Sequence, residues 1–353
     1  MYLHSFFYNV ELRNKIIIKM KDSNFFNAGL SIFGQLLSFI PDSIYKDAVE
    51  EYNSDHNKKF STKEHFICMF YAVLTRNSSL REVCKNIMLF GKKLLQIGVY
   101  NLPYKSTFSD ANIKRSHEVF ACIYYKLYHH YKPYLNEKSF SLPIVGEVQS
   151  DKVEIFDSTT LTLFKEVLKG AGRNSINGTK KGGIKAFTKM NLAEGVPNFV
   201  CFKASACNEN SFLQTLKLEA GSIAVFDKGF NKYAYFKKWL ESDNFFVTRL
   251  RENAKYLVLE KKDLEPDSGI KKDELIELSY KEGKNLRTVC LRLITYTDAV
   301  SKETLQFLTN LTELKASTIA LLYKNRWIIE VLFKQLKQNF ELKYFLSDSE
   351  NGI

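Results

Sequence analysis

Apolar residues in the first third of the chain recur at intervals of three and four, the spacing that places them on one face of an α-helix. Start signals support helices here, because Ser61 and Glu64 have the spacing of a capping box and Ser79 precedes another helical run. We therefore expect a helical N-terminal domain over residues 23–135. Its clearest helical runs are FNAGLSIFGQLLSFI, KEHFICMFYAVLT, LREVCKNIMLFGKKLLQIG and SHEVFACIYYKLYHHY.

The pattern changes after residues 136–150, a stretch with Pro143 and Gly146 that is typical of a connection. One helical run, NKYAYFKKWLES, stands among the short β-rich runs KVEIFDSTTLTLF, KAFTKMNLA, PNFVCFKAS, GSIAVFD and NFFVTRL. Alternating residues then predict a mostly antiparallel β block over 253–312, and a long helix begins at residue 313. We expect an α/β domain over residues 145–353, with strands first and helices packed on them.

The chain carries a net charge of +12 and has a pI near 9.2, which favours a polyanionic partner. Residues 51–100 are locally basic, with eight Lys and Arg against four Asp and Glu. This helical block is either a solvated surface or a surface that binds the ends of a DNA segment. No run of about 18 apolar residues is present, so we expect no membrane span. Residues 1–22 are interpreted as an extension, with Met20 as a second candidate start.

The positions of cysteine and histidine limit the chemistry that the chain can perform. The six cysteines form no C-x₂-C pair, so we expect buried, reduced thiols rather than a zinc or redox site. All six histidines lie before residue 131, so the later region cannot build a His-based triad or zinc site from its own residues. If that region is catalytic, carboxylates must carry the chemistry.

Two aspartates follow apolar strands of the predicted sheet. Asp157 closes VEIFD and Asp227 closes SIAVFD, so both are expected at the rim where open α/β sheets bind ligands. Like carboxylates repel at short range, so a close pair needs a cation or a proton between its members. Each aspartate also has a simpler interpretation as a loop residue that caps a following helix, as Asp227 would for NKYAYF.

A third acid lies in the last long helix. Tyr323, Arg326, Glu330 and Lys337 fall within an arc of about 60° on that helix, with Lys334 just beyond it. Apolar residues cover the neighbouring arc, so one face is expected to pack on the sheet while its edge presents Glu330 among cations. An ordinary amphipathic helix supported by a Glu330–Lys334 pair is the alternative. Three carboxylates of this kind would bind Mg²⁺, which prefers oxygen ligands and serves phosphoryl transfer.

The spacing Tyr323-x₂-Arg326-x₃-Glu330-x₆-Lys337 resembles the signature helix of DDE transposases of the insertion-sequence-four type. FDSTTLTLF and VFDKGFNKYAYF resemble the family's first and second aspartate segments, and NFFVTRLREN, TLQFLTN and LYKNRWIIEVLFKQLKQNFELKYF follow in the family's order. The resemblance covers roughly residues 24–350. ACNENSF departs from it, since many relatives carry a His-Asp pair there, and the chain ends at SDSENGI where the family usually continues into a further helix.

This resemblance implies a ribonuclease-H-like catalytic fold in which residues 253–312 are a β insertion. Asp157, Asp227 and Glu330 would be the catalytic residues and the ligands of two Mg²⁺ ions, for which Mn²⁺ can substitute. The implied reaction nicks double-stranded DNA at the terminal inverted repeats of the element. The freed 3′-hydroxyl then attacks target DNA, and a homodimer acts on the paired ends. Some relatives use a DNA hairpin and stack a flipped base on tryptophan. The implied DNA contacts are Tyr323, Arg326, Trp327, Lys334, Lys337 and Arg249. The resemblance also implies a prokaryotic, cytoplasmic protein that is associated with the nucleoid.

Two other functions fit the same residues. A catalytically inactive or truncated remnant would bind DNA without cutting it, and a nuclease of the same fold would cut DNA without joining it.

Overall fold

The structure is a computed structural model that describes residues 30–55, 59–90, 92–135, 147–162, 183–264, 266, 268–340, 346–347 and 350–352. The predicted extension over residues 1–22 and most of the predicted connection lie outside the described residues. The chain divides into two compact units. The first comprises Met1–Pro133 and Lys337–Ile353, and the second comprises Tyr134–Leu336.

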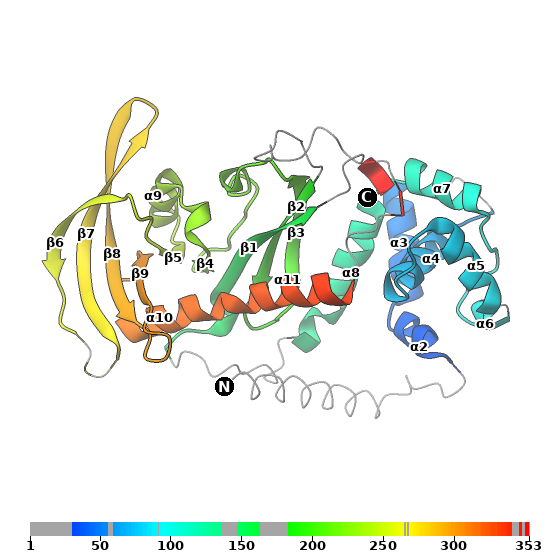
Figure 1. Ribbon diagram of the computed structural model, residues 1–353, viewed down its shortest axis with the longest axis horizontal. Helices are drawn as coiled ribbons and strands as arrows, with labels where there is room; N and C mark the ends of the chain where they lie inside the picture. Colours follow the sequence, from blue (N-terminus) through cyan, green and yellow to red (C-terminus); the bar gives the residue numbers. More distant parts are fainter. Residues whose placement is uncertain are drawn as a thin grey trace. The chain divides into compact units, whose positions relative to one another are not determined.

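The second unit is built on a nine-stranded sheet with the order β3-β2-β1-β4-β5-β9-β8-β7-β6 (Figure 1). Strand β1 is parallel to β4 and β4 is parallel to β5, whereas every other neighbouring pair is antiparallel. The predicted α/β class and the mostly antiparallel β block are therefore confirmed. The strands are β1 Val153–Thr162, β2 Gly183–Asn191, β3 Pro197–Ala204, β4 Ile223–Val225, β5 Phe245–Arg249, β6 Lys255–Lys261, β7 Ile270–Glu282, β8 Asn285–Thr297 and β9 Thr304–Thr309.

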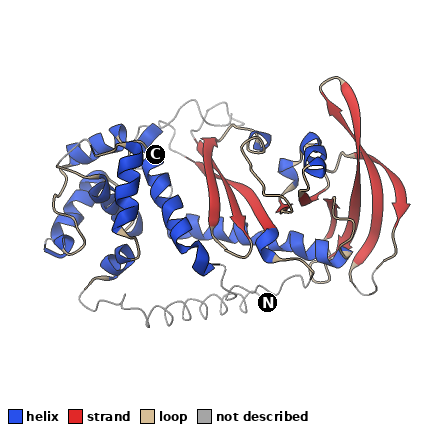
Figure 2. Ribbon diagram, turned by 180° about the vertical axis from the view of Figure 1, so that it is seen from behind, coloured by secondary structure: helices blue, strands red, loops and turns tan. Residues whose placement is uncertain are grey.

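Helices cover both faces of the parallel strands. On one face, α9 (Tyr233–Glu241) buries Phe236, whose ring centroid lies 4.2 Å from that of Phe246. On the other face, α10 (Ala316–Asn325) and α11 (Trp327–Asn339) run across the strands (Figures 1 and 2). The predicted packing of the last helix on the sheet is therefore correct. Its buried residues Ile319, Leu322, Ile329 and Phe333 share one cluster with Ile155, Val225 and Val247 of the strands.

A buried ion pair joins the antiparallel block to the start of α10. Arg292 of β8 binds both carboxylate oxygens of Asp273 on β7, at 2.8 and 2.6 Å, and both side chains are 4% exposed. The same guanidinium also donates to the carbonyl oxygens of Leu311, Thr312 and Leu314, in the loop that enters α10. Arg292 thereby fixes the point from which α10 and α11 start across the sheet.

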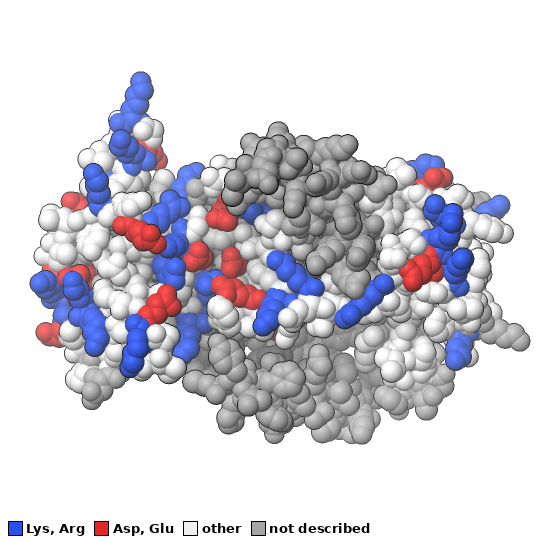
Figure 3. Space-filling view, in the orientation of Figure 1, with Lys and Arg blue, Asp and Glu red and all other residues white. Residues whose placement is uncertain are grey.

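Charged side chains are unevenly distributed over the sheet unit. On the face drawn in Figure 3, Asp and Glu gather beside α11, while Lys and Arg gather over the hairpin between β7 and β8. Like charges repel unless an opposite charge lies between them, so the acidic region depends on nearby cations.

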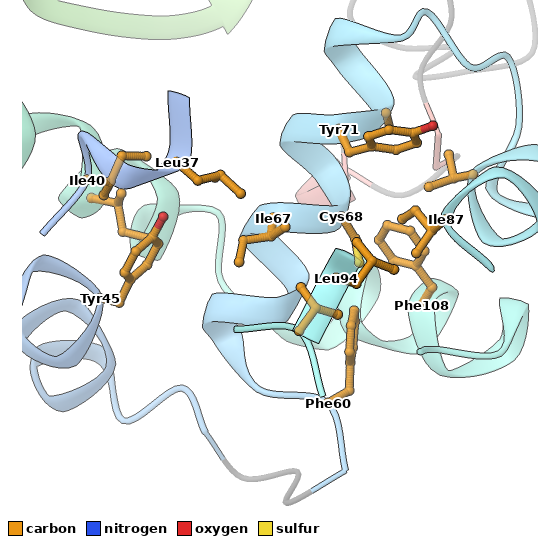
Figure 4. Packing of buried hydrophobic residues seen from close by; sticks show 14 of the residues in the cluster. Leu37, Ile40, Tyr45, Phe60, Ile67, Cys68, Tyr71, Ile87, Leu94 and Phe108 are labelled. Atoms are coloured by element: carbon orange, nitrogen blue, oxygen red, sulfur yellow. The ribbon is translucent and has the colours of Figure 1, made fainter. Parts of the chain in front are cut away.

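The first unit is helical, as the sequence predicts. In α4, the Ser61 side chain accepts from the Glu64 backbone N–H and the Glu64 carboxylate accepts from the Ser61 N–H, so the predicted capping box is present. Figure 4 shows the core around α4, where Ile67 and Cys68 lie among residues of the other helices. The helices are α2 Ile32–Ser38, α3 Asp42–Tyr52, α4 Thr62–Leu74, α5 Leu80–Phe90, α6 Lys92–Leu95, α7 Lys105–Lys114 and α8 Glu118–Leu135.

Residues from late in the sequence complete this helical unit. The Asn351 side-chain amide donates to the backbone carbonyls of residues 112, 113 and 115, at the end of α7. The Asn351 side-chain oxygen accepts from the His117 backbone N–H at 3.0 Å. The short 3-10 helix at Glu350–Gly352 is thus held on residues more than 230 positions earlier in the chain.

All six cysteines are free thiols. Cys68, Cys84 and Cys122 are buried as expected, whereas Cys201 and Cys207 are half-buried and Cys290 is exposed. The expectation of burial is wrong for Cys290 because it lies on an outward-facing position of β8, between the buried Val289 and Leu291. In the part of the chain that the structure describes, every helix falls short of the length and apolar character that crossing a bilayer requires.

Replacing Asp273 with alanine leaves the Arg292 guanidinium buried without its carboxylate. We expect Asp273→Ala to lower the free energy of unfolding by about 3–5 kcal/mol, because an unpaired buried charge is strongly destabilising. Urea denaturation followed by circular dichroism measures this loss. Glu260→Ala on the exposed strand β6 is the matched control and should change stability by less than about 0.5 kcal/mol. Equal urea midpoints for the two variants would show that the Arg292–Asp273 pair does not stabilise the antiparallel β block.

Candidate active site

Three polar residues form a row across the sheet directly beyond its apolar core. Ile155 of β1 pairs in register with Val225 of β4, and Val225 pairs with Val247 of β5. Side chains two positions apart point to the same face of a strand. Asp157, Asp227 and Arg249 each stand two positions after one of these apolar residues, so all three are placed on the face that α10 and α11 cover.

The strand positions of the two aspartates differ from the prediction. Asp157 does not close its strand, because β1 continues to Thr162 through its pairing with β2. The pairing of β1 with β4, however, ends at Ile155, and this places Asp157 at the rim of the parallel strands. Asp227 follows β4 and caps the short helix Lys228–Phe230 rather than α9, since its side chain accepts from the Gly229 backbone N–H.

The predicted long helix is divided at Arg326, where α10 ends and α11 begins. The Arg326 N–H donates to the Tyr323 carbonyl, and the Arg326 carbonyl accepts from the Ile329 N–H. Both hydrogen bonds span three residues, the tighter pattern of a 3-10 turn. The turn places Arg326 between Tyr323, at the end of α10, and Glu330, in the first turn of α11.

Arg326 joins two of the candidate carboxylates. One terminal nitrogen lies 2.9 Å from Asp157 Oδ2 and the other lies 2.5 Å from Glu330 Oε1. The Arg326 side chain is only 12% exposed, so these ion pairs are weakly screened by solvent. Its Nε is buried and has no hydrogen-bond partner among the described residues. The single positive charge of the guanidinium is therefore shared between two acids, and its Nε is a donor without a partner among the described residues.

Asp227 is held by two other side chains of the same row and helix. The Tyr323 hydroxyl donates to Asp227 Oδ1 at 3.3 Å, and Arg249 Nε lies 4.0 Å from the same oxygen. Arg249 also lies 3.9 Å from Glu303 Oε1. Arg326 stands over the Tyr323 ring, 5.4 Å from its centroid. Asp157, Asp227 and Glu330 are thus linked through Arg326 and Tyr323 into one cluster.

The environment of Asp157 changes its acidity. Burial raises the pKa of its carboxyl to about 6, with smaller upward contributions from Glu330 and Asp227. The Ser158 backbone N–H, which donates to Asp157 Oδ1 at 2.7 Å, and the Arg326 cation both act in the opposite direction. Burial also raises the pKa of Tyr323 to about 12, so its hydroxyl stays a hydrogen-bond donor near neutral pH.

A fourth acid, Glu209, lies beside this cluster, and no sequence motif points to it. A Cβ atom built on Gly229 would collide with the Glu209 carboxylate and would lie 3.8 Å from Asp227 Oδ2, so both acids face this glycine. Glu209 is paired with Lys185 at 3.4 Å, and the Lys185 side chain is 3% exposed. Glu209 falls within ACNENSF, the segment that departs from the family pattern. That departure is the one sequence signal that marks Glu209, and it does not predict the ion pair with Lys185.

The remaining predicted site residues lie along α11. Trp327 is 54% exposed and Lys334 is exposed, so both are accessible to a partner outside the chain. Lys337 lies near the end of α11 and is the first residue of the second segment of the first unit. The predicted contacts of these three residues with DNA stay predictions.

The carboxylates fit a hard divalent cation by their chemistry, since all their donor atoms are oxygens. As they stand in the structure, however, no three His, Cys, Asp or Glu side chains among the described residues form a metal-binding group. One oxygen of each carboxylate already has a partner within the chain. Arg326 already occupies Asp157 Oδ2 and Glu330 Oε1, and the Tyr323 hydroxyl occupies Asp227 Oδ1.

Comparison with known proteins places most of the second unit in one family. Residues 149–353 match the family model described as "Transposase DDE domain", and residues 28–100 match one described as "Domain of unknown function (DUF4372)".

The chain is also similar to curated bacterial proteins. It is 28% identical over 205 residues to "Putative transposase y4zB" of Sinorhizobium fredii, covering 57% of this chain and 56% of that protein. It is 27% identical over 253 residues to "Putative transposase for insertion sequence element IS4SA" of Synechocystis sp., covering 70% and 66%. The chain thus spans between about half and two thirds of the length of these relatives.

Among solved structures, a piggyBac transposase synaptic complex with hairpin DNA aligns with 85% of this chain and 66% of that chain. The TM-score of this alignment is 0.39 and the sequence identity is 14%.

Removing the Arg326 charge should raise the pKa of Asp157 above its value of about 6, because the guanidinium favours the ionised carboxylate. We expect this increase in Arg326→Met and a smaller change in Arg326→Lys, which retains a cation. An NMR titration of ¹³C-labelled aspartate carboxyls measures the pKa. Arg287→Met, in the exposed pair with Glu282, is the control and should leave Asp157 unchanged. An Asp157 titration that is the same in Arg326→Met and wild type would contradict the coupling.

Proposed function

The chain belongs to the transposase DDE domain family, and from that premise we propose that it is the transposase of an insertion sequence. It cuts double-stranded DNA at the terminal inverted repeats of the element and joins the freed 3′-hydroxyl ends to target DNA. The observation that carries the proposal is the cluster in which Arg326 and Tyr323 link Asp157, Asp227 and Glu330. These acids lie on β1, directly after β4 and on α11, and they are 70 and 103 positions apart along the chain.

The proposal includes a ribonuclease-H-like core. The order β3-β2-β1-β4-β5, with only β1, β4 and β5 mutually parallel, supports it. Strands β6 to β9 lie between Asp227 and Glu330 in the sequence, as expected of a β insertion over residues 253–312. Residues 23–135 are proposed as the DNA-binding domain, and their local excess of Lys and Arg supports this assignment.

Divalent cations, Mg²⁺ or Mn²⁺, belong to this proposal, with Asp157, Asp227 and Glu330 as the residues that would hold them. When bound, two such ions stabilise the attacking and the leaving oxygen of a phosphodiester displacement. The clustered acids need a positive charge between them, and Arg326 supplies it in the structure. Bound cations would therefore compete with Arg326 for Asp157 Oδ2 and Glu330 Oε1.

Arg326, once released, is placed to hold the DNA phosphate. Its planar fork binds phosphate oxygens in pairs, and its Nε is already a donor without a partner among the described residues. Arg249 supplies a second cation on the sheet side, and the Tyr323 hydroxyl supplies a neutral donor. Along the exposed side of α11, Trp327 would stack on a base, while Lys334 and Lys337 would contact backbone phosphates. A homodimer would bring the two element ends together.

Replacing any of the three acids should slow DNA cleavage strongly. With Mg²⁺ or Mn²⁺, Asp157→Ala, Asp227→Ala and Glu330→Gln should each cut a duplex carrying the element ends roughly a thousandfold more slowly than wild type. Such a loss corresponds to about 4 kcal/mol of transition-state stabilisation. Gel analysis of labelled DNA measures the rate. Asp151→Asn, an exposed acid just before β1, is the control and should cut normally.

The same assay separates the other candidate functions. Cleavage that persists in the three variants would refute the site. A wild type that binds the ends and never cuts would be a DNA-binding remnant. A wild type that cuts without joining 3′ ends to a target plasmid would be a nuclease.

Cation binding should weaken at acid pH because a cation competes with a proton for Asp157. Its pKa is raised to about 6, so the carboxyl is mostly protonated below that pH and ionised above it. We expect the affinity for Mn²⁺, measured by isothermal titration calorimetry, to fall about tenfold for each pH unit below about 6 and to level off above it. Asp157→Ala is the control and should show little Mn²⁺ binding at any of these pH values. Equal affinities for wild type on both sides of pH 6 would exclude Asp157 as a ligand.

A further inference from the structure

A hollow of about 720 Å³ lies between α9 and the hairpin that joins β7 to β8. Its volume falls in the range of about 300–1,000 Å³ that holds small ligands in proteins. None of Asp157, Asp227, Glu330, Tyr323 and Arg326 is among its lining residues. The hollow is therefore a separate feature of the sheet unit, and the candidate active site does not account for it.

Cations outnumber acids around the hollow. Its lining includes Lys232, Lys238, Arg251 and Lys281, with Glu282 as the one acid among the lining residues. Glu282 is already engaged with Arg287, at 3.7 Å. Four cations around one hollow repel one another in the free protein, and an anion bound among them would remove that repulsion. The charge of the hollow thus selects a negatively charged ligand.

Hydrogen-bond donors and aromatic rings complete the lining. The Tyr233 hydroxyl is buried and, among the described residues, has no hydrogen-bond partner. Helix α9 begins at Tyr233, and its N-cap residue Lys232 makes no side-chain capping hydrogen bond. The Lys232 amine lies 4.9 Å from the centroid of the Tyr235 ring. Phosphate oxygens suit such donors, and aromatic rings suit the sugar or base attached to the phosphate.

The hollow is tied to the loop that carries Asp227. Arg251 lines the hollow, and its guanidinium donates to the carbonyl oxygens of Lys228 and Gly229, at 3.1 and 3.3 Å. The lining segment starts at Asn231, four residues after Asp227, and the Asn231 amide is fixed to the Arg249 carbonyl at 2.8 Å. A ligand in the hollow therefore binds against the same rigid turn that positions a candidate metal ligand.

We propose that this hollow binds a phosphate-bearing nucleotide unit of the DNA. This backbone contact is separate from the nucleotide that would be cut at Asp157, Asp227 and Glu330. The inference rests on the proposed function, because DNA is the polyanion that this function brings to the sheet unit. Lys238 and Lys281 approach the phosphates from two sides, and the Tyr233 hydroxyl donates to a phosphate oxygen.

The first test uses the full chain and a fluorescein-labelled duplex carrying the element end, with anisotropy measured in EDTA between about 50 and 200 mM salt. The double variant Lys238→Gln, Lys281→Gln should make the slope of log affinity against log salt about 1 to 2 less steep. Each phosphate contact that is lost means that fewer counterions are released when the DNA binds. The matched control is Lys271→Gln, Lys272→Gln. It makes the same charge change at the opposite, exposed end of β7 and should retain the wild-type slope.

A second variant separates binding from folding. Tyr233→Phe removes a buried hydroxyl that has no partner in the described structure, so it should not lower the melting temperature. It should nevertheless weaken DNA binding about fivefold, since the donor to the phosphate is lost. Weaker binding together with unchanged thermal stability supports the proposal.

The outcomes that overturn the inference are distinct from those that overturn the proposed function. Equal salt slopes for the two lysine double variants, or a Tyr233→Phe variant with wild-type affinity, would overturn the nucleotide site alone. A wild-type protein that binds no duplex at any salt concentration would overturn both.

Discussion

The ion pairs of Arg326 with Asp157 and Glu330 are the interaction on which the candidate site depends. Asp157 and Arg326 are 169 residues apart in the sequence, and their contact joins the first strand of the sheet to the helix that crosses it. Carboxylates gathered at the rim of buried strands repel one another unless a cation lies between them. Arg326 supplies that charge within the chain itself. The cluster is consequently stable as a protein structure while it retains the donor atoms that a divalent cation prefers.

Register, rather than strand ends, positions the polar residues of the site. Ile155, Val225 and Val247 form one row of the core, and the next residues on the same face are Asp157, Asp227 and Arg249. Such a row forms only if three strands pair without slippage, because a shift of one residue would turn every side chain to the other face. Arg292 and Asp273 then determine where α10 begins. The end of that helix places Tyr323 and Arg326 over the row of polar residues.

Local patterns predicted the elements and the family, because each depends on spacing within one segment. The same patterns selected the three acids, whose catalytic role stays a prediction. The capping box at Ser61 is an example, and the signature helix from Tyr323 is another. Features that depend on contacts between segments were not predictable in this way. The length of β1 beyond Asp157 is set by its pairing with β2, and the turn at Arg326 accompanies ion pairs with two carboxylates, one of them 169 residues earlier in the chain. Glu209 and Lys185 carry no sequence pattern of their own, since their pairing arises only when the loop after β3 meets β2.

The hydrogen bonds of Asn351 have a consequence for the order in which the protein is made. The Asn351 side-chain amide binds the carbonyl of Asn112, 239 residues earlier in the chain. During synthesis, all the strands of the sheet leave the ribosome before residue 351 does, so the helical unit lacks this support until translation has passed the sheet unit. Contacts of such long sequence separation form late and slow folding. The helical segments made first therefore acquire their last contacts after the sheet has had the opportunity to fold.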